Sequence, residues 1–76
     1  MKRLSFKILL REEPEGGYTV LVPSLPGCIS FGETIEEAKK MALDAIAVYL
    51  ESKKKHNEPI IDDTGVIEDT LSISLA

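Results

Sequence analysis

The order of strands and helix along this chain follows from one stretch, YTVLVPSLPGCISFGETIEEA, residues 18–38, which contains the turns and element boundaries. Its β-branched opening predicts a strand over Tyr18–Val22. Pro23–Gly27 predicts a connector, because neither of its prolines can donate to a strand ladder. A second short strand is expected over Cys28–Phe31, and a helix begins after Thr34.

The helix start has the pattern of a capping box, Thr34-Ile35-Glu36-Glu37. In that pattern the Thr34 side chain accepts from the N–H of Glu37, and Glu37 reaches back to the N–H of Thr34. Lysines 53–55 suit the last turn, where cations are favoured. The pattern predicts a helix over Ile35–Lys53. Its apolar residues recur at helical spacing: Ile35, Ala38, Ala42, Ala45, Ile46 and Tyr49.

Both flanks of the chain show the two-residue alternation of a half-buried strand. Residues 4–11 alternate on the N-terminal side, so a hairpin to residues 18–22 is expected through the turn at 12–17. Residues 71–75 alternate Leu-Ser-Ile-Ser-Leu and predict a last strand facing the helix. The expected element order is β-β-β-α-β.

One helix covers only one face of such a sheet, so the second face is bare. Leu9 and Leu21 are expected on that bare face and adjacent to each other if the strands pair in the simplest register. Alternate residues of the third strand join them, which leaves either Ile29 and Phe31 or Cys28 and Ser30. This face is a candidate contact surface. The competing interpretation is two scattered exposed leucines of no special role.

The composition limits the classes of function. The 76 residues include nine Lys plus Arg against thirteen Asp plus Glu, a formal charge of −4, which argues against direct nucleic-acid binding and suits a basic protein partner. We expect a single domain over residues 1–76, and so small a chain favours homo-oligomerisation, as a dimer or larger. One cysteine and the absence of a signal or membrane segment predict a soluble cytoplasmic protein.

No residue constellation predicts catalysis, a cofactor or a firm metal site. His56 stands alone at a polar helix end, so a solvated histidine is the favoured interpretation. Cys28 has no nearby base and is favoured as a small buried thiol. The acidic residues of loop 62–69 favour a solvated loop, although cation binding stays open. These acidic residues are Asp62, Asp63, Glu68 and Asp69.

The combined spacing resembles the HicB antitoxin family. The resemblance lies in Tyr18, then Pro23-Ser24-Leu25-Pro26-Gly27-Cys28, then Gly32-Glu33-Thr34 with Glu37-Ala38. It implies an α+β, β-β-β-α-β partial RNase H-like fold. One helix then packs on a four-stranded mixed sheet of order 3-2-1-4, with the last strand parallel to the first. The acidic metal ligands of RNase H enzymes are missing from the first and last predicted strands, so nuclease activity is not carried over.

The resemblance also implies a partner. HicB proteins neutralise HicA, a small basic toxin with a double-stranded-RNA-binding fold that cleaves mRNA through a catalytic histidine. Many HicB proteins carry a C-terminal helix-turn-helix or ribbon-helix-helix domain that binds DNA. Because this sequence ends at Ala76, neither such a domain nor direct DNA binding is expected.

The leading hypothesis is therefore a non-catalytic antitoxin that occludes the active surface of a HicA-type toxin. Two alternatives stay open: a degenerate metal-dependent nuclease that uses the acidic loop, and a self-associating module that binds a small ligand between protomers. Partner binding is assigned to one set of residues from the bare face and the connector. These are Leu9, Leu21, Pro23, Leu25, Pro26, Cys28 and Phe31.

Overall fold

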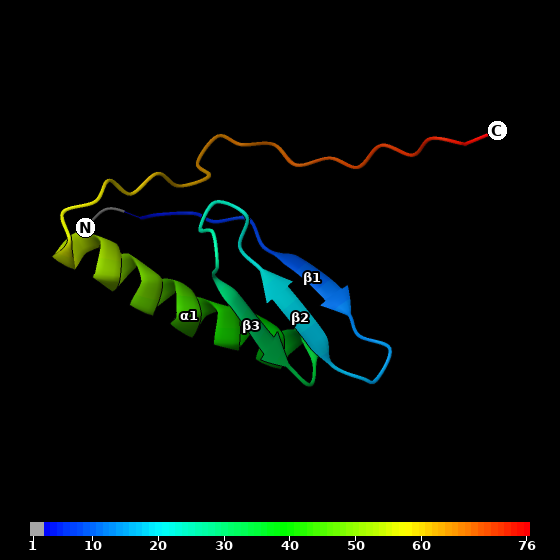
Figure 1. Cartoon of the computed structure of the whole chain (residues 1–76), viewed down its shortest axis with the longest axis horizontal. Coiled ribbons are helices and arrows are strands. Elements are labelled where there is room, and N and C mark those ends of the chain that lie inside the picture. The colour runs from blue at the N-terminus through cyan, green and yellow to red at the C-terminus, as the bar shows by residue number, and fades with distance from the viewer. Residues whose placement is uncertain (1–2) are drawn as a thin grey trace.

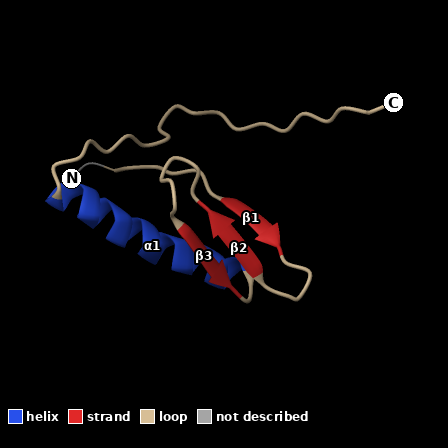
Figure 2. Cartoon of the chain, viewed as in Figure 1, coloured by secondary structure: helices blue, strands red, loops and turns tan. Residues whose placement is uncertain are grey.

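The computed structural model describes residues 3–76, in which three strands are followed by one long helix. The strands are β1 (Leu9–Glu12), β2 (Tyr18–Leu21) and β3 (Ile29–Gly32), and the helix is α1 (Ile35–Lys55) (Figure 1). The helix lies across one face of the sheet, and the residues after it run back past the N-terminal segment as an irregular extended chain (Figure 2). No helix within residues 3–76 has the length and apolar character that crossing a membrane requires.

The sheet is antiparallel throughout, in the order β1-β2-β3. Leu9 pairs with Leu21, and Leu21 pairs in turn with Ile29 on the third strand. The adjacency expected for Leu9 and Leu21 is confirmed. The first hairpin closes through Gly16 and Gly17, which have positive φ angles of 103° and 83° that L side chains rarely adopt.

The core lies between the sheet and α1, where Val20, Ala38 and Ala42 are fully buried. The small alanines let the helix approach the sheet closely. Gly32 has the same role at the helix start, because a Cβ atom there would collide with the backbone of Ala38. This close approach, rather than an unusual backbone conformation, explains the glycine before the cap.

The capping box forms with one difference from the sequence expectation. The Thr34 hydroxyl accepts a hydrogen bond from the N–H of Glu37 at 3.1 Å, as predicted. The Glu37 carboxylate, however, accepts from the N–H of Glu33 at 3.1 Å rather than from that of Thr34. At the other end, α1 extends two residues past the predicted Lys53, to Lys55.

The predicted four-stranded mixed sheet of order 3-2-1-4 is wrong. Residues 66–76 form no strand, and Leu71, Ile73 and Leu75 are 93%, 88% and 92% exposed. A strand requires a partner backbone, and two-residue alternation alone does not supply one. The chain instead turns outward at Gly65, where φ is +84°, and leaves the body of the molecule.

The first strand is also shorter than the predicted residues 4–11. It begins only at Leu9, because residues 4–8 extend beyond the end of β2 and have no strand beside them. Backbone groups of Ser5 and Lys7 are bound by residues 62 and 63 instead. The N-terminal segment is therefore held by the chain that follows the helix.

Candidate partner-binding surface

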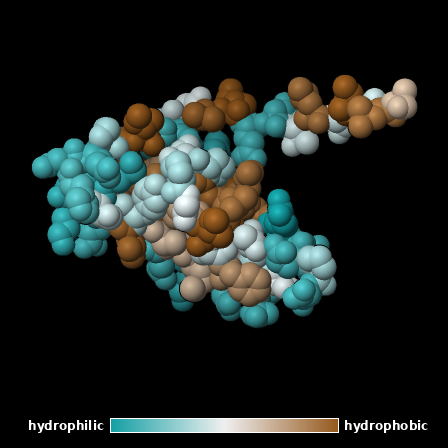
Figure 3. Space-filling model, viewed as in Figure 1, coloured by the Kyte–Doolittle hydropathy of each residue, from teal (hydrophilic) through white to brown (hydrophobic). Residues whose placement is uncertain are grey.

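The face of the sheet opposite α1 carries apolar side chains in two adjacent cross-strand rows. Since Val20 points into the core, its neighbours on β2 point outward, and Leu21 is flanked by Leu9 and Ile29 in the register. Leu9, Ile29 and Phe31 are 43%, 60% and 46% exposed. We call these four residues, Leu9, Leu21, Ile29 and Phe31, the open sheet face. Apolar surface is visible over the middle of the molecule in Figure 3.

The connector after β2 is closed by its own backbone. The Leu25 N–H donates to the Val22 carbonyl, and the Cys28 N–H donates to the Leu25 carbonyl, each at 2.9 Å. Leu25 and Cys28 are buried at 1% and 6% exposure, whereas Pro23 and Pro26 lie at the surface. The Pro-x-Leu-Pro-Gly-Cys motif therefore turns its leucine and cysteine into the core and its prolines outward.

Side chains of α1 also hold this connector in place. The Tyr49 hydroxyl donates a hydrogen bond of 2.8 Å to the Pro26 carbonyl. Leu25 and Cys28 also pack with Val22 in a second core cluster, against side chains of α1. The connector thus has a fixed position beside the open sheet face.

A hollow of 310 Å³ brings together six of the seven residues assigned to partner binding from the sequence. Phe31 lies outside this hollow, on the neighbouring row of the sheet, where its cross-strand partner is Thr19. Leu25 and Cys28 line the hollow although both residues are buried. The six residues are Leu9, Leu21, Pro23, Leu25, Pro26 and Cys28.

Residues 62 and 63 form an acidic hook that binds the N-terminal segment. Asp63 is 8% exposed; its carboxylate accepts from the Lys7 N–H at 2.7 Å and from the Ser24 hydroxyl. The Asp62 carboxylate accepts from the Ser5 N–H at 2.9 Å. The Ser24 hydrogen bond, followed by that of Lys7, lowers the pKa of Asp63 below its ordinary value, and the Thr64 hydroxyl and the Ser5 N–H lower the pKa of Asp62. These carboxylates hold the backbone together, a role that their sequence pattern did not reveal.

The remaining candidate residues lie apart from one another. Burial raises the pKa of the Cys28 thiol, which disfavours the thiolate that a nucleophilic cysteine requires. The His56 ring nitrogen Nδ1 lies 2.8 Å from the Ser52 carbonyl oxygen at the helix end. Within residues 3–76 no group of three or more His, Cys, Asp or Glu side chains is arranged to hold a metal ion.

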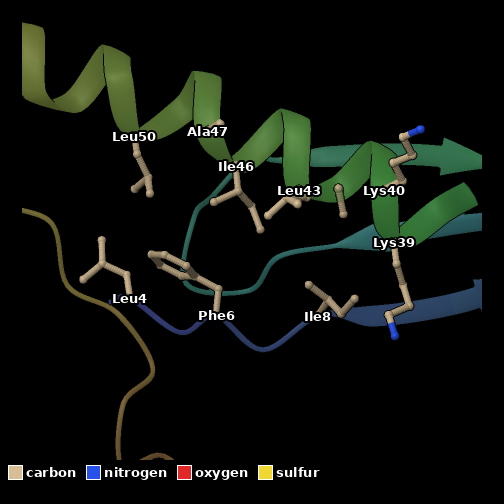
Figure 4. A pocket seen from close by; sticks show the side chains of 10 residues that line it. Leu4, Phe6, Ile8, Lys39, Lys40, Leu43, Ile46, Ala47 and Leu50 are labelled. Carbon is tan, nitrogen blue, oxygen red and sulfur yellow. The ribbon is translucent and has the colours of Figure 1, made fainter. Parts of the chain in front are cut away.

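A second apolar feature lies on the opposite side of the sheet from the open face. The N-terminal segment and α1 enclose a groove of 620 Å³, and Lys39 and Lys40 line it near its Ile8 end (Figure 4). The sequence pattern directed residues 4, 6 and 8 toward the helix but treated them as core. They line a groove because the expected last strand does not cover them. Its apolar lining includes Leu4, Phe6, Ile8, Leu43, Ile46 and Leu50.

Comparisons with known proteins agree with the connector and capping motifs. Residues 6–73 match the family model described as HicB-like antitoxin of bacterial toxin–antitoxin system. A UPF0150 protein of Thermoplasma acidophilum is 42% identical over 62 residues, covering 82% of this chain and 90% of that protein. A UPF0150 protein of Archaeoglobus fulgidus is 39% identical over 65 residues, covering 86% of this chain and 94% of that protein.

A longer relative carries the family's functional name. Antitoxin HicB 1 of Photorhabdus laumondii is 34% identical over all 76 residues, which span 49% of its own length. The match to the family model covers most of the chain, including the connector, α1 and the three strands that carry the open sheet face. The chain belongs to the HicB-like antitoxin family of bacterial toxin–antitoxin systems.

Proposed function

We propose that this protein is a non-catalytic antitoxin that binds a basic HicA-type toxin and covers its active surface. The observation that carries the proposal is the family match over residues 6–73. The open sheet face gives the proposal a surface: an apolar row across three strands, beside a connector with two exposed prolines. Apolar centres with polar rims are typical of protein interfaces.

The distribution of charge supports a basic partner. The first hairpin and the start of α1 meet at the same end of the sheet, since Tyr18 pairs with Gly32 there. Glutamates gather at that end, next to Phe31 of the open sheet face, and most of them are exposed. Opposite charges at an interface rim speed association and fix orientation. These residues are Glu12, Glu13, Glu15, Glu33, Glu36 and Glu37.

The proposal assigns inhibition to occlusion, with no chemistry by this chain. Leu9, Leu21, Ile29 and Phe31 would contact the toxin directly, with Pro23 and Pro26 at the edge of the contact. Leu25 and Cys28 would act only by keeping the connector in place, because both are buried. No contact within residues 3–76 favours the degenerate-nuclease alternative, since the Asp62 and Asp63 carboxylates bind backbone and hydroxyl groups.

The test is co-expression with a HicA-type toxin, with growth and co-purification as readouts. The wild-type chain is expected to restore growth and to co-purify with the toxin. Ile29→Asp places a charge in the apolar row, so it is expected to abolish rescue. Ile61→Asp is the matched control, because Ile61 is also exposed, at 77% against 60% for Ile29, but lies in the chain after α1.

The result that would overturn the proposal is equally direct. If the wild-type chain neither binds nor neutralises any HicA-type toxin, including one encoded beside its own gene, the function is wrong. If it neutralises the toxin and both aspartate variants do so equally, the open sheet face is not the contact surface. Far-ultraviolet circular dichroism of each variant establishes that α1 is retained.

A further inference from the structure

The groove between the N-terminal segment and α1 has an apolar lining and no cover from its own chain. The N-terminal segment lines one side of it with Leu4, Phe6 and Ile8 at two-residue spacing, and α1 lines the other side with Leu43 and Leu50. Leu43 is 67% exposed. Contiguous exposed apolar surface marks protein interaction sites and ligand-binding grooves.

The C-terminal segment, residues 66–76, has the complementary chemistry. Leu71, Ile73 and Leu75 repeat at the same two-residue spacing, and each is about nine-tenths exposed. The span from Leu71 to Leu75 equals that from Leu4 to Ile8, about 13 Å in an extended chain. Apolar side chains of this segment project from the body of the molecule, as Figure 3 shows.

We propose that the groove of one copy receives residues Leu71–Leu75 of a second copy, so that two chains exchange their C-terminal segments. The direction of the segment favours a second copy over the chain's own groove. The acidic hook fixes residue 63 against Ser5, and the Gly65 turn then sends the chain outward. In Figure 1 this segment runs away from the N-terminal segment and α1, which form the groove, toward the side of the view where β1 ends.

A two-fold axis makes the exchange reciprocal and sets its direction. With the axis perpendicular to the segments, the partner's segment runs opposite to this chain's own. It therefore enters the groove from the Ile8 end, which carries Lys39 and Lys40, and continues toward Leu4. Its acidic pair, Glu68 and Asp69, then lies beside those lysines. In this orientation the acidic pair meets the lysines, and the apolar side chains of the segment meet those of the groove.

The size of the core gives a physical reason for the exchange. Within residues 3–76, only six apolar residues are buried. Small domains bury a low fraction of their surface and are marginally stable, so additional burial by association stabilises them. Exchange would cover the groove and three large apolar side chains of each copy together. This inference goes beyond antitoxin function and does not depend on it.

The first experiment measures the mass of the full chain in solution by light scattering over a range of concentrations. The expected result is a dimer of twice the 8.4 kDa chain mass. Ile73→Asp is expected to weaken dimerisation by at least roughly 10-fold, because it places an unpaired charge in an apolar groove. Ser74→Asp is the matched control, since its side chain points the other way. A wild-type monomer at all concentrations, or an Ile73→Asp dimer as stable as wild type, would overturn the proposal.

The second experiment separates exchange from the chain's own segment folding back. Leu43→Asp damages only the groove, and Ile73→Asp damages only the segment. If the segments are exchanged, the two variants each fail to form homodimers, but when mixed they associate through the one intact groove–segment pair. A chain with both substitutions does not associate with wild type, because neither pair is intact. Two variants that stay monomeric when mixed would rule out exchange, and helical circular dichroism checks that each is folded.

Discussion

The Asp63 carboxylate accepts a hydrogen bond from the backbone N–H of Lys7 at 2.7 Å, although the two residues lie 56 positions apart in the sequence. The backbone N–H of Asp63 in turn donates to the Ser5 carbonyl at 2.7 Å, and the Ser24 hydroxyl donates to the same carboxylate. One side chain therefore joins the N-terminal segment, the connector and the chain after the helix. These links hold one wall of the groove and set the point from which the C-terminal segment departs.

The first prediction is a pH-dependent contribution of Asp63 to stability. Its pKa is lowered in the folded state, chiefly by Ser24 and then by Lys7. Its stabilising effect is therefore complete above the ordinary value of 3.8 and is lost as pH falls through the lower folded value. Asp63→Asn is expected to lower the melting temperature at neutral pH, and the difference from wild type should shrink in strong acid. Thermal unfolding at several pH values measures this, with Glu51→Gln as the control.

An equal melting temperature for wild type and Asp63→Asn at neutral pH would contradict the importance of the hook. A difference that stays constant down to strongly acidic pH would show that the substitution acts through packing and not through the charge of the carboxylate.

The second prediction concerns the N-terminal cap of α1. Thr34→Ala removes the hydroxyl that accepts from the Glu37 N–H. Loss of such a cap costs about 0.5–2 kcal/mol of unfolding free energy. Urea denaturation followed at the helical circular dichroism band measures the loss. Thr70→Ala, in the exposed C-terminal segment, should leave the transition unchanged, and an equal effect of both substitutions would argue against the cap.

The third prediction concerns whether a substitution of Gly32 raises or lowers the free energy of unfolding. Gly32→Ala adds a methyl group that collides with the backbone of Ala38, and overpacking of this kind costs about 1–3 kcal/mol. Without the collision, the same change would stabilise by about 0.4–1 kcal/mol, because alanine restricts the unfolded chain. Chemical denaturation of Gly32→Ala therefore tests the close approach of sheet and helix directly. Ser30→Ala on the same strand is the control for general effects on β3.

The fourth prediction concerns the attachment of the connector to α1. Tyr49→Phe removes the hydroxyl that donates to the Pro26 carbonyl, and a hydrogen bond of this kind contributes about 0.5–1.5 kcal/mol. Hydrogen exchange should accelerate at the Leu25 and Cys28 amides, whose bonds close the connector. Tyr18→Phe should not accelerate exchange at these two amides. Unchanged protection in Tyr49→Phe would mean that the buried Leu25 side chain alone holds the connector.

Local sequence patterns predicted much of the body of the molecule. The helix start was predicted at the correct residue, because capping depends on side chains only three positions apart. The pairing of Leu9 with Leu21 followed from alternation and one short hairpin. Interactions of this range are written into neighbouring residues, so the sequence by itself determined the hairpin, the connector and the helix.

The tertiary structure alone decided which predicted features have partners. Residues 71–75 have the alternation of a strand but no backbone beside them in their own chain, so the expected fourth strand does not form. Leu25 belongs to the same motif as the exposed Pro23 and Pro26, yet its side chain faces the core. Asp63 was assigned to a solvated acidic loop, but it is buried against Lys7 and Ser24. Each outcome depends on residues distant in the chain, whose proximity only the packing of the helix and the chain after it can establish.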